Sequence, residues 1–298
     1  MEPLHFNRWL VNQSYQRHLL QVGFTDRLLG WVLDRLRSTG LYDRSLIVVT
    51  ADNGEGFGRL GNGHEINRAN AGDIALTPLI VKLPGQRTGR LLGRHIRTID
   101  VLPTIARIAH VRLPRGVQGR SVFGPAARRI PSSTTLVKRS GQRVRLGFQS
   151  LKRRGNASLR LKLRLFGSGN EPPGLFGLGR GRALQGTPVS RWKVLAPGGT
   201  RAEIDAPSRY RRVQRSSGSV PLRVMGRLTG SGSRKGIDMA VAVNGTIAAT
   251  PPTFRPRRGA TQLFSALVPE SALRDGENRV ELYAIVGGGT PRLRPLTP

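Results

Sequence analysis

Two short apolar runs that lack polar alternation constrain the fold of this chain most strongly. Residues 46–49 and 79–81 each place consecutive aliphatic side chains between turn-forming segments. A strand with this pattern is covered on both faces, as in the sheet of an α/β protein. Pro78 cannot donate a hydrogen bond to a strand ladder, so we expect pairing of the second run to begin at Leu79.

Two helices are predicted around these strands. From residue 14 to residue 38, apolar residues recur at the spacing of one helical face, and Gly40 follows as a C-terminal stop. Gly30 lowers the helix propensity inside this pattern, which indicates that the helix touches another backbone closely there. A shorter helix is predicted in "RTIDVLPTIARIAHV", with Asp100 at its N-cap and Pro103 in its first turn.

The pattern changes after about Gly124. Short runs rich in Val, Leu, Ile and Thr then alternate with Gly, Ser and Pro, which is typical of an all-β module with an immunoglobulin-like or jelly-roll sandwich architecture. Asn244-Gly245, between two apolar runs, predicts a type I′ hairpin. We therefore predict an α/β domain over residues 1–124 and a basic β-rich domain over residues 125–298.

The charge of the chain is strongly positive and unevenly distributed. The 298 residues include 49 Lys and Arg and 17 Asp and Glu, a formal net charge of +32. Residues 1–130 hold 19 basic and 9 acidic residues, a net of +10, and residues 131–298 hold 30 and 8, a net of +22. Such a balance predicts attraction to nucleic acid, anionic lipid or anionic glycan. Nucleic acid is the weakest of these, because aromatic residues make up only 5% and no nucleic-acid motif is present.

One segment concentrates this charge. Residues 138–164 carry ten basic residues and no acidic one. We interpret the segment either as a solvated β surface or as a patch that faces an anion.

The absence of cysteine excludes several kinds of site. A disulfide framework, a thiolate zinc site, a cysteine nucleophile and any modified residue derived from cysteine are ruled out within these residues. The opening "MEPLHFNRWL" has an acid, no basic region and no following apolar run, so no secretory signal is predicted. No segment approaches the roughly 18 to 20 apolar residues of a membrane span.

The segment "LIVVTADNGEGFG" holds the main candidate site. Asp52 and Asn53 follow the first predicted strand at its carboxyl end, where α/β sheets gather ligands. Their oxygens suit a hard cation, and Gly54 lets the backbone turn away. On spacing alone, however, a plain Asp-Asn-Gly turn is favoured. His64 lies twelve residues beyond Asp52 and can return to the same strand end, whereas His95 has fewer polar neighbours.

Four segments in order resemble one known family. They are "TDRLLGWVLDRLRSTGLYDRSLIVVTADNGEGFG", "TPLIVKLPGQ", "RTIDVLPTIARIAHVRLP" and "GRSVFG". Together they resemble the C-terminal half of a sulfatase-like hydrolase or transferase of the alkaline phosphatase superfamily, over about residues 14–124. More narrowly, the chain is similar to membrane-anchored sulfatase-like proteins of high-GC actinobacteria, in which a β-rich tail follows the hydrolase domain. The resemblance implies a membrane-anchored parent with an extracytoplasmic domain and an anionic sulfate or phosphate ester substrate.

The resemblance reverses the preference at the Asp-Asn-Gly step. It implies that Asp52 and Asn53 are two ligands of a divalent metal, and the Asn form is like calcium-binding sulfatases, with manganese, magnesium or zinc as alternatives. In the family a later basic residue contacts the sulfate or phosphate oxygens. His64 is the best match for it. The loop departs from the usual "GEHG" pattern, with Leu60 where a His is often found, so Arg68 is a second candidate.

Two parts of the family's catalytic centre have no counterpart in this sequence. They are the nucleophile, a formylglycine from a C/S-x-P-x-R motif or a Thr, and the acidic metal pair on the family's first strand. We therefore assign no catalytic residue. We expect a fragment of a metal-dependent sulfuric ester hydrolase, or of a phosphoryl or phosphoglycerol transferase, that is inactive alone.

Two other functions remain open from the sequence. One is a binding protein whose basic β module recognises an anionic glycan, lipid or cell-wall polymer. The other is a free-standing enzyme with an unrecognised site.

Overall fold

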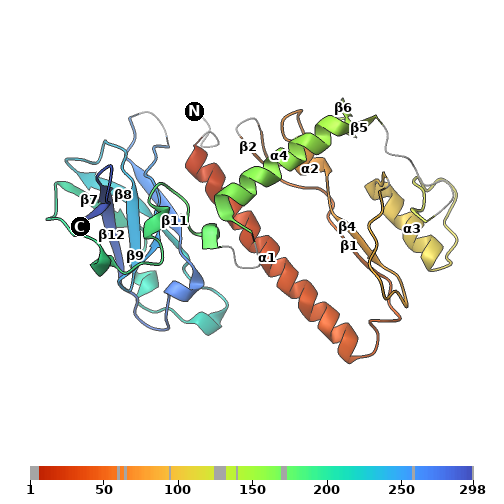
Figure 1. Cartoon of the computed structure of the whole chain (residues 1–298), viewed down its shortest axis with the longest axis horizontal. Helices are drawn as coiled ribbons and strands as arrows, with labels where there is room; N and C mark the ends of the chain where they lie inside the picture. The colour runs from red at the N-terminus through yellow and green to blue at the C-terminus, as the bar shows by residue number, and fades with distance from the viewer. Residues whose placement is uncertain are drawn as a thin grey trace. The chain divides into compact units, whose positions relative to one another are not determined.

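The computed structural model describes residues 7–58, 61–63, 66–93, 95–123, 132–138, 140–168, 173–256 and 259–296. The chain forms two compact units, one from residues 1–21 and 161–298 and the other from residues 22–160 (Figure 1). The predicted domain boundary at residue 124 falls inside the second unit. Because residue 124 is not among the described residues, that division remains a prediction.

Residues 22–160 form short helices and small antiparallel sheets. Three two-stranded sheets are present, β1 with β4, β2 with β3, and β5 with β6. The strands are β1 (Ile47–Thr50), β2 (Gly56–Gly58), β3 (Gly61–Gly63), β4 (Leu79–Lys82), β5 (Ser133–Val137) and β6 (Arg143–Gly147). The α-helices are α2 (Ala71–Ala75) and α3 (Val101–Ile108), together with most of α1 (Arg8–Ser38) and α4 (Phe148–Phe166). This mixture of helix and strand agrees with the predicted class.

The first helix, α1, begins earlier than its apolar pattern predicted. The Asn7 side-chain oxygen accepts hydrogen bonds from the backbone N–H groups of Trp9 and Leu10, which caps the helix start. At the other end Gly40 has φ of 70°, and the N–H of Leu41 donates to the Leu36 carbonyl at 2.9 Å. The predicted C-terminal stop is therefore confirmed.

The second half of α1 packs much less than expected. None of its residues from 22 to 38 is buried, and the side chains of Phe24 and Trp31 are 52% and 62% exposed. Among the described residues, no atom outside the helix's own backbone lies within 4 Å of the place that a Cβ atom on Gly30 would take, so the predicted close backbone contact there is wrong. On the apolar face predicted from the sequence, Leu29, Leu33 and Leu36 are partly buried, whereas Phe24 and Trp31 lie on the other side of the helix, which the described residues do not cover.

The strands β1 and β4 run side by side and antiparallel (Figure 1). Thr50 pairs with Leu79, which confirms that pairing begins after Pro78. Residues 47–49 are only partly buried, however, and within the described chain β4 is the one strand paired with β1. The expectation of a strand covered on both faces is therefore wrong for this structure, because neither a second neighbouring strand nor a covering layer buries it.

Helix α3 confirms the shorter predicted helix. Asp100 precedes it and is 2% exposed. One carboxylate oxygen accepts from the Arg97 N–H at 2.9 Å, and the other accepts from the Arg120 N–H at 2.8 Å. Asp100 therefore holds the start of the helix against the later "GRSVFG" segment, where the N–H of Val122 donates to the Thr104 hydroxyl.

Helix α4 corrects the interpretation of residues 138–164 as a β surface for residues 148–164, whereas residues 143–147 do form the strand β6. "LRLKLRL", residues 159–165, alternates apolar and basic residues at the period of a strand. From Leu151 onward the packed positions nevertheless recur at helical spacing, and they are residues 151, 155, 158, 162, 165 and 166. The tertiary contacts of Leu151 and Phe166, 3% and 1% exposed, override the local alternation.

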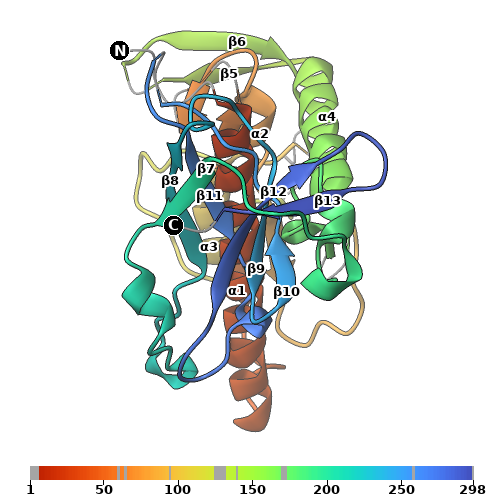
Figure 2. The same ribbon diagram turned by 90° about the vertical axis from the view of Figure 1, so that its left-hand side faces the viewer.

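The remaining strands belong to the other unit and form two antiparallel sheets (Figure 2). One has the order β10-β9-β12-β13 and the other β11-β8-β7. The strands are β7 (Thr200–Ile204), β8 (Arg223–Gly230), β9 (Met239–Val243), β10 (Thr246–Ala249), β11 (Leu263–Leu267), β12 (Val280–Val286) and β13 (Arg292–Pro295). Both sheets contribute to one buried cluster, which includes Leu228, Val241 and Phe264.

The hairpin between β9 and β10 is the one predicted from Asn244-Gly245. These residues have φ of 51° and 81°, as a type I′ turn requires. Assignment of the two sheets to an immunoglobulin-like or jelly-roll sandwich remains a prediction. Among the described residues, no helix combines the length and the apolar character needed to cross a membrane.

Candidate metal centre

The candidate metal ligands stand just beyond the end of β1. The Thr50 hydroxyl donates to the Pro78 carbonyl at 2.8 Å, which fixes the end of this strand to the residue before β4. Asp52 is exposed and Asn53 is partly buried. Both side chains thus follow the carboxyl end of a strand, as the sequence predicted.

Hydrogen bonds orient the two side chains. The backbone N–H of Asn53 donates to Asp52 Oδ1 at 2.8 Å, and Asn53 Nδ2 donates to the Gly54 carbonyl at 2.9 Å. The second carboxylate oxygen of Asp52 and the amide oxygen of Asn53 accept no hydrogen bond within the described chain. These two oxygens are therefore available as hard ligands.

Gly54 joins this turn to the short helix α2. Its N–H donates to the Ile74 carbonyl at 2.8 Å. A Cβ atom at this position would lie 1.9 Å from the Asp73 carbonyl oxygen, so only glycine fits without displacement of the backbone. The conformational freedom attributed to Gly54 is thus accompanied by a steric requirement that the sequence did not reveal.

Two glycines, Gly72 of α2 and Gly155 of α4, bring these two helices close together. A Cβ atom on Gly72 would lie 2.6 Å from the backbone nitrogen of Gly155 in α4. Ala71 is buried beside them in one cluster with Leu146 and Leu151. Residues from β6 and α4, which the sequence assigned to a separate β domain, therefore support the candidate metal turn.

Arg68 lies on an exposed turn that leads into α2. Asn67 and Asn70 fold this turn: the Asn67 N–H donates to Asn70 Oδ1 at 2.8 Å, and the Asn70 N–H donates to Asn67 Oδ1 at 3.1 Å. No hydrogen bond or ion pair joins Arg68 to Asp52 in the described residues. His64, the preferred basic candidate, lies outside the described residues.

His95 does not join the metal ligands. Its ring packs edge-on against Phe148, with centroids 5.4 Å apart and an interplanar angle of 88°. No group of three or more His, Cys, Asp or Glu residues that could hold a metal is found in the part of the chain that the structure describes. Asp52 and Asn53 therefore form at most part of a metal site there.

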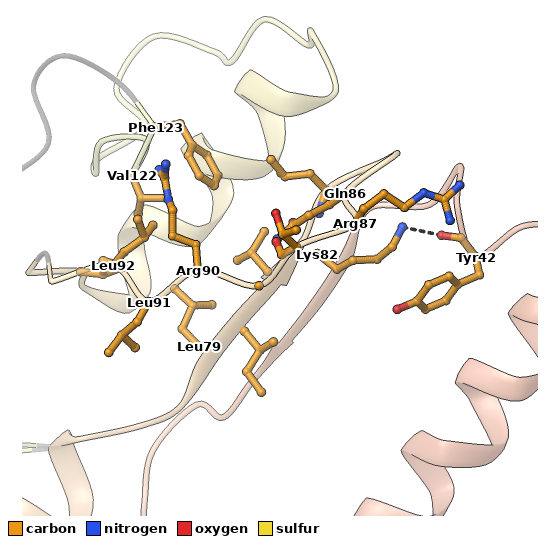
Figure 3. Close-up of a pocket in the computed structure, with 16 residues that line it drawn as sticks. Tyr42, Leu79, Lys82, Gln86, Arg87, Arg90, Leu91, Leu92, Val122 and Phe123 are labelled. Carbon is orange, nitrogen blue, oxygen red and sulfur yellow. Dashed lines mark hydrogen bonds between the residues drawn. The ribbon is translucent and has the colours of Figure 1, made fainter.

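A cavity of about 760 Å³ lies elsewhere in residues 22–160 (Figure 3). It is lined by β4, the segment that follows it, Tyr42, and the pair Val122 and Phe123. Two of its cations already have partners: Lys82 Nζ donates to the Tyr42 carbonyl, and Arg87 pairs with Asp43 at 3.2 Å. Neither candidate metal ligand lines the cavity, so we do not assign it to the metal centre.

Comparison with known proteins shows which family the segment that contains this turn is similar to. The sulfatase family model matches residues 4–111. An ulvan-active sulfatase of Formosa agariphila is 26% identical over 113 residues, which are 37% of this chain and 21% of that protein. The multifunctional alkaline phosphatase superfamily protein PehA of Trinickia caryophylli is 35% identical over 111 residues, or 36% and 21%. Arylsulfatase K of Bos taurus is 26% identical over 114 residues, or 38% and 19%.

These matches cover only a limited part of each relative. The chain spans about a fifth of the length of the curated relatives it matches. No solved structure matches the chain.

Proposed function

We propose that this chain carries one half of a metal-dependent ester hydrolase centre. The basis is that the chain is a sulfatase-like member of the alkaline phosphatase superfamily, matched over part of its length. The turn formed by Asp52, Asn53 and Gly54, inside the matched residues 4–111, is the observation that carries the proposal. The substrate we propose is an anionic sulfate ester, with a phosphate ester or phosphoglycerol transfer as the alternative.

The two side chains fit a divalent cation as partial ligands. One carboxylate oxygen and one amide oxygen accept no hydrogen bond from the described residues. Both are hard donors that suit calcium, manganese or magnesium better than a thiophilic metal. Calcium usually takes six to eight oxygens, so we propose that further ligands complete the site. A bound cation would neutralise negative charge on the transferring sulfuryl or phosphoryl oxygens.

Arg68 is our proposed contact for the ester anion among the described residues. Its guanidinium is exposed on the turn before α2, and α2 abuts Gly54. A guanidinium binds sulfate or phosphate oxygens with two parallel hydrogen bonds, which suits this role. His64 keeps the same proposed role, which its place outside the described residues leaves as a prediction.

The uncovered face of α1 supports the proposal that the hydrolase centre needs further structure. Phe24, Leu28, Trp31 and Val32 lie on one side of this helix and are 40% to 62% exposed. Apolar side chains grouped in this way usually pack against another layer. Because the match covers a fifth of each relative, we propose that other parts of a sulfatase domain cover this face.

A chimera tests the assignment of Asp52 and Asn53. Residues 4–111 would replace the matched segment of the Trinickia caryophylli protein, and hydrolysis of aryl sulfate and aryl phosphate esters would be followed. We expect Asp52→Ala to lower kcat/KM by at least about a hundredfold, because loss of a metal ligand removes charge stabilisation in the transition state. Asp34→Ala is the matched control, since Asp34 is an exposed carboxylate whose one ion pair in the described part of the chain is with Arg37. Equal activity of the two variants would contradict the assignment.

The 298-residue chain tests the proposed dependence on additional ligands. Isothermal titration with calcium should show binding no tighter than about millimolar, as expected of a site with few ligands. No turnover of either aryl ester is expected from this chain by itself. Turnover that Asp52→Ala abolishes would instead show a complete active centre and overturn this part of the proposal.

A further inference from the structure

The exposed face of α4 combines cations with apolar side chains. Five of its cations are exposed: Lys152, Arg153, Arg154, Arg160 and Arg164. Within the described chain, none of the five forms an ion pair or a side-chain hydrogen bond. The helix contains no acidic residue, so this face has no internal charge compensation.

Two leucines lie along one side of this exposed face. Leu159 and Leu163 are 53% and 45% exposed, whereas Leu161, which is 36% exposed, points to the other side of the helix. Leu159 and Leu163 are four residues apart and form one row along the helix, and Arg160 and Arg164 form the adjacent row. Arginine stems can lie along an apolar surface while their guanidinium groups reach a polar layer.

The opposite face of α4 is already occupied. Leu151 is 3% exposed, and Gly155 approaches Gly72 of α2. Burial of Leu159 and Leu163 against α2 would require α4 to rotate away from these contacts. The exposed leucines are therefore available to an external surface.

From these observations we propose that α4 is an interfacial helix that binds an anionic lipid bilayer. The row of leucines would enter the boundary between head groups and acyl chains, and the adjacent arginines would bind lipid phosphates. A soluble polyanion would use the arginines but gives no reason for the exposed leucines, so charge and apolar character together favour the bilayer. This inference does not depend on the proposed hydrolase centre, since no residue of that centre takes part.

Vesicle binding by the complete 298-residue chain tests the proposal. Co-sedimentation would compare phosphatidylcholine vesicles with vesicles that also contain phosphatidylglycerol. We expect binding to the anionic vesicles, weaker binding as salt is added, and little binding to phosphatidylcholine alone. Equal binding to both kinds of vesicle, or no binding to either, would overturn the proposal.

Paired variants then test the helix face. We expect Leu159→Ser with Leu163→Ser, and separately Arg160→Gln with Arg164→Gln, each to lower the partition coefficient by about tenfold. Matched controls are Leu91→Ser with Leu102→Ser, which change leucines that are 98% and 52% exposed, and Arg211→Gln with Arg212→Gln, which change exposed arginines. The control pairs should retain binding. A loss equal to that of the helix variants would assign the binding to net charge or general apolarity and overturn the proposal.

Heparin distinguishes a bilayer from a soluble polyanion. The leucine pair should leave retention on a heparin column unchanged while it weakens vesicle binding. If the arginine pair abolishes heparin retention and both pairs leave vesicle binding intact, α4 binds a polymer and the proposal is wrong. Circular dichroism of each variant should match the parent chain, because the substituted side chains are exposed.

Discussion

The backbone of Gly54 lies against the carbonyl group of Asp73, so closely that a Cβ atom would stand 1.9 Å from the carbonyl oxygen. A hydrogen bond of 2.8 Å from the Gly54 N–H to the Ile74 carbonyl holds the same approach. The turn that carries Asp52 and Asn53 is thus joined directly to α2. Any change that moves α2 should therefore move the candidate metal ligands.

Gly54→Ala is expected to destabilise the chain. The added methyl group would overlap a backbone oxygen that cannot rotate away, and overpacking of this kind costs about 1 to 3 kcal/mol. Urea unfolding followed by circular dichroism would measure the loss. Gly30→Ala is the control, because in the described structure only the helix's own backbone lies near the position its methyl group would take. Alanine also favours the helix by roughly 0.5 to 1 kcal/mol. Equal effects at the two glycines would contradict the steric interpretation.

Gly72→Ala is expected to loosen the packing of α4 on α2. A methyl group there would lie 2.6 Å from the Gly155 nitrogen, so the helices must separate at this point. Limited trypsin digestion measures the change, because Lys152, Arg153 and Arg154 are cleavage sites in the same helix. We expect cleavage in α4 to accelerate several-fold as local opening becomes easier. Gly93→Ala, where the added methyl group meets open space, should leave the digestion rate unchanged.

Local signals in the sequence predicted several elements correctly. The stop at Gly40, the pairing from Leu79 and the hairpin at Asn244-Gly245 each depend on the backbone preferences of a few neighbouring residues. The helix at residues 148–166 was missed because its alternation of leucine and basic residues also fits a strand. Long-range packing of Leu151 decides between the two, and a local pattern does not contain that information.

The candidate site, too, was predictable from local sequence only in part. Its two candidate oxygen ligands follow an apolar run, but only the family resemblance favoured them over a plain turn, and the family match includes both residues. The support from α2 and α4 was not predicted, since Gly72 and Gly155 are far apart in sequence and neither carries a side chain that marks a contact. The best signal available was the presence of glycine inside two otherwise helical segments.

Stability should fall at alkaline pH through Tyr210. Burial raises the pKa of Tyr210 to about 12, with a lowering influence from Arg209 and a raising one from Asp205. Its hydroxyl donates to the Arg223 carbonyl at 2.9 Å, a bond that the tyrosinate cannot make. The pKa of Tyr210 in the folded chain lies above the unfolded value of 10.0. Its contribution to the free energy of unfolding is therefore complete below pH 10 and is lost as the pH rises towards 12.

Tyr210→Phe tests this dependence. The variant should be less stable by about 1 kcal/mol at neutral pH, where a hydrogen bond is lost, and its stability should fall less steeply above pH 10. Urea unfolding at a series of pH values gives both quantities. Part of the alkaline loss should persist, because burial and the hydrogen bond to Glu281 raise the pKa of Tyr283 to about 12 as well. An unchanged slope in Tyr210→Phe would show that Tyr210 does not contribute.

The carbonyl of Ser265 lies on β11, an edge strand of its sheet, and accepts hydrogen bonds from two donors on α1. Trp9 Nε1 donates to it at 2.9 Å and Gln13 Nε2 at 2.8 Å. Both side chains are buried, so they exclude water from a strand edge that would otherwise be open. Either donor alone still satisfies the carbonyl. We therefore expect the effects of removing the two donors on the free energy of unfolding to be more than additive.

A double-mutant cycle with Trp9→Phe and Gln13→Leu measures this coupling. Each single variant should cost about 1 kcal/mol, whereas the double variant leaves a buried carbonyl without a partner and should cost a further 1 to 3 kcal/mol or so beyond the sum. Urea unfolding of the four proteins gives the interaction energy. If the two single effects simply add, water hydrogen-bonds to the Ser265 carbonyl in the double variant. That result would contradict the exclusion of water from β11 by α1.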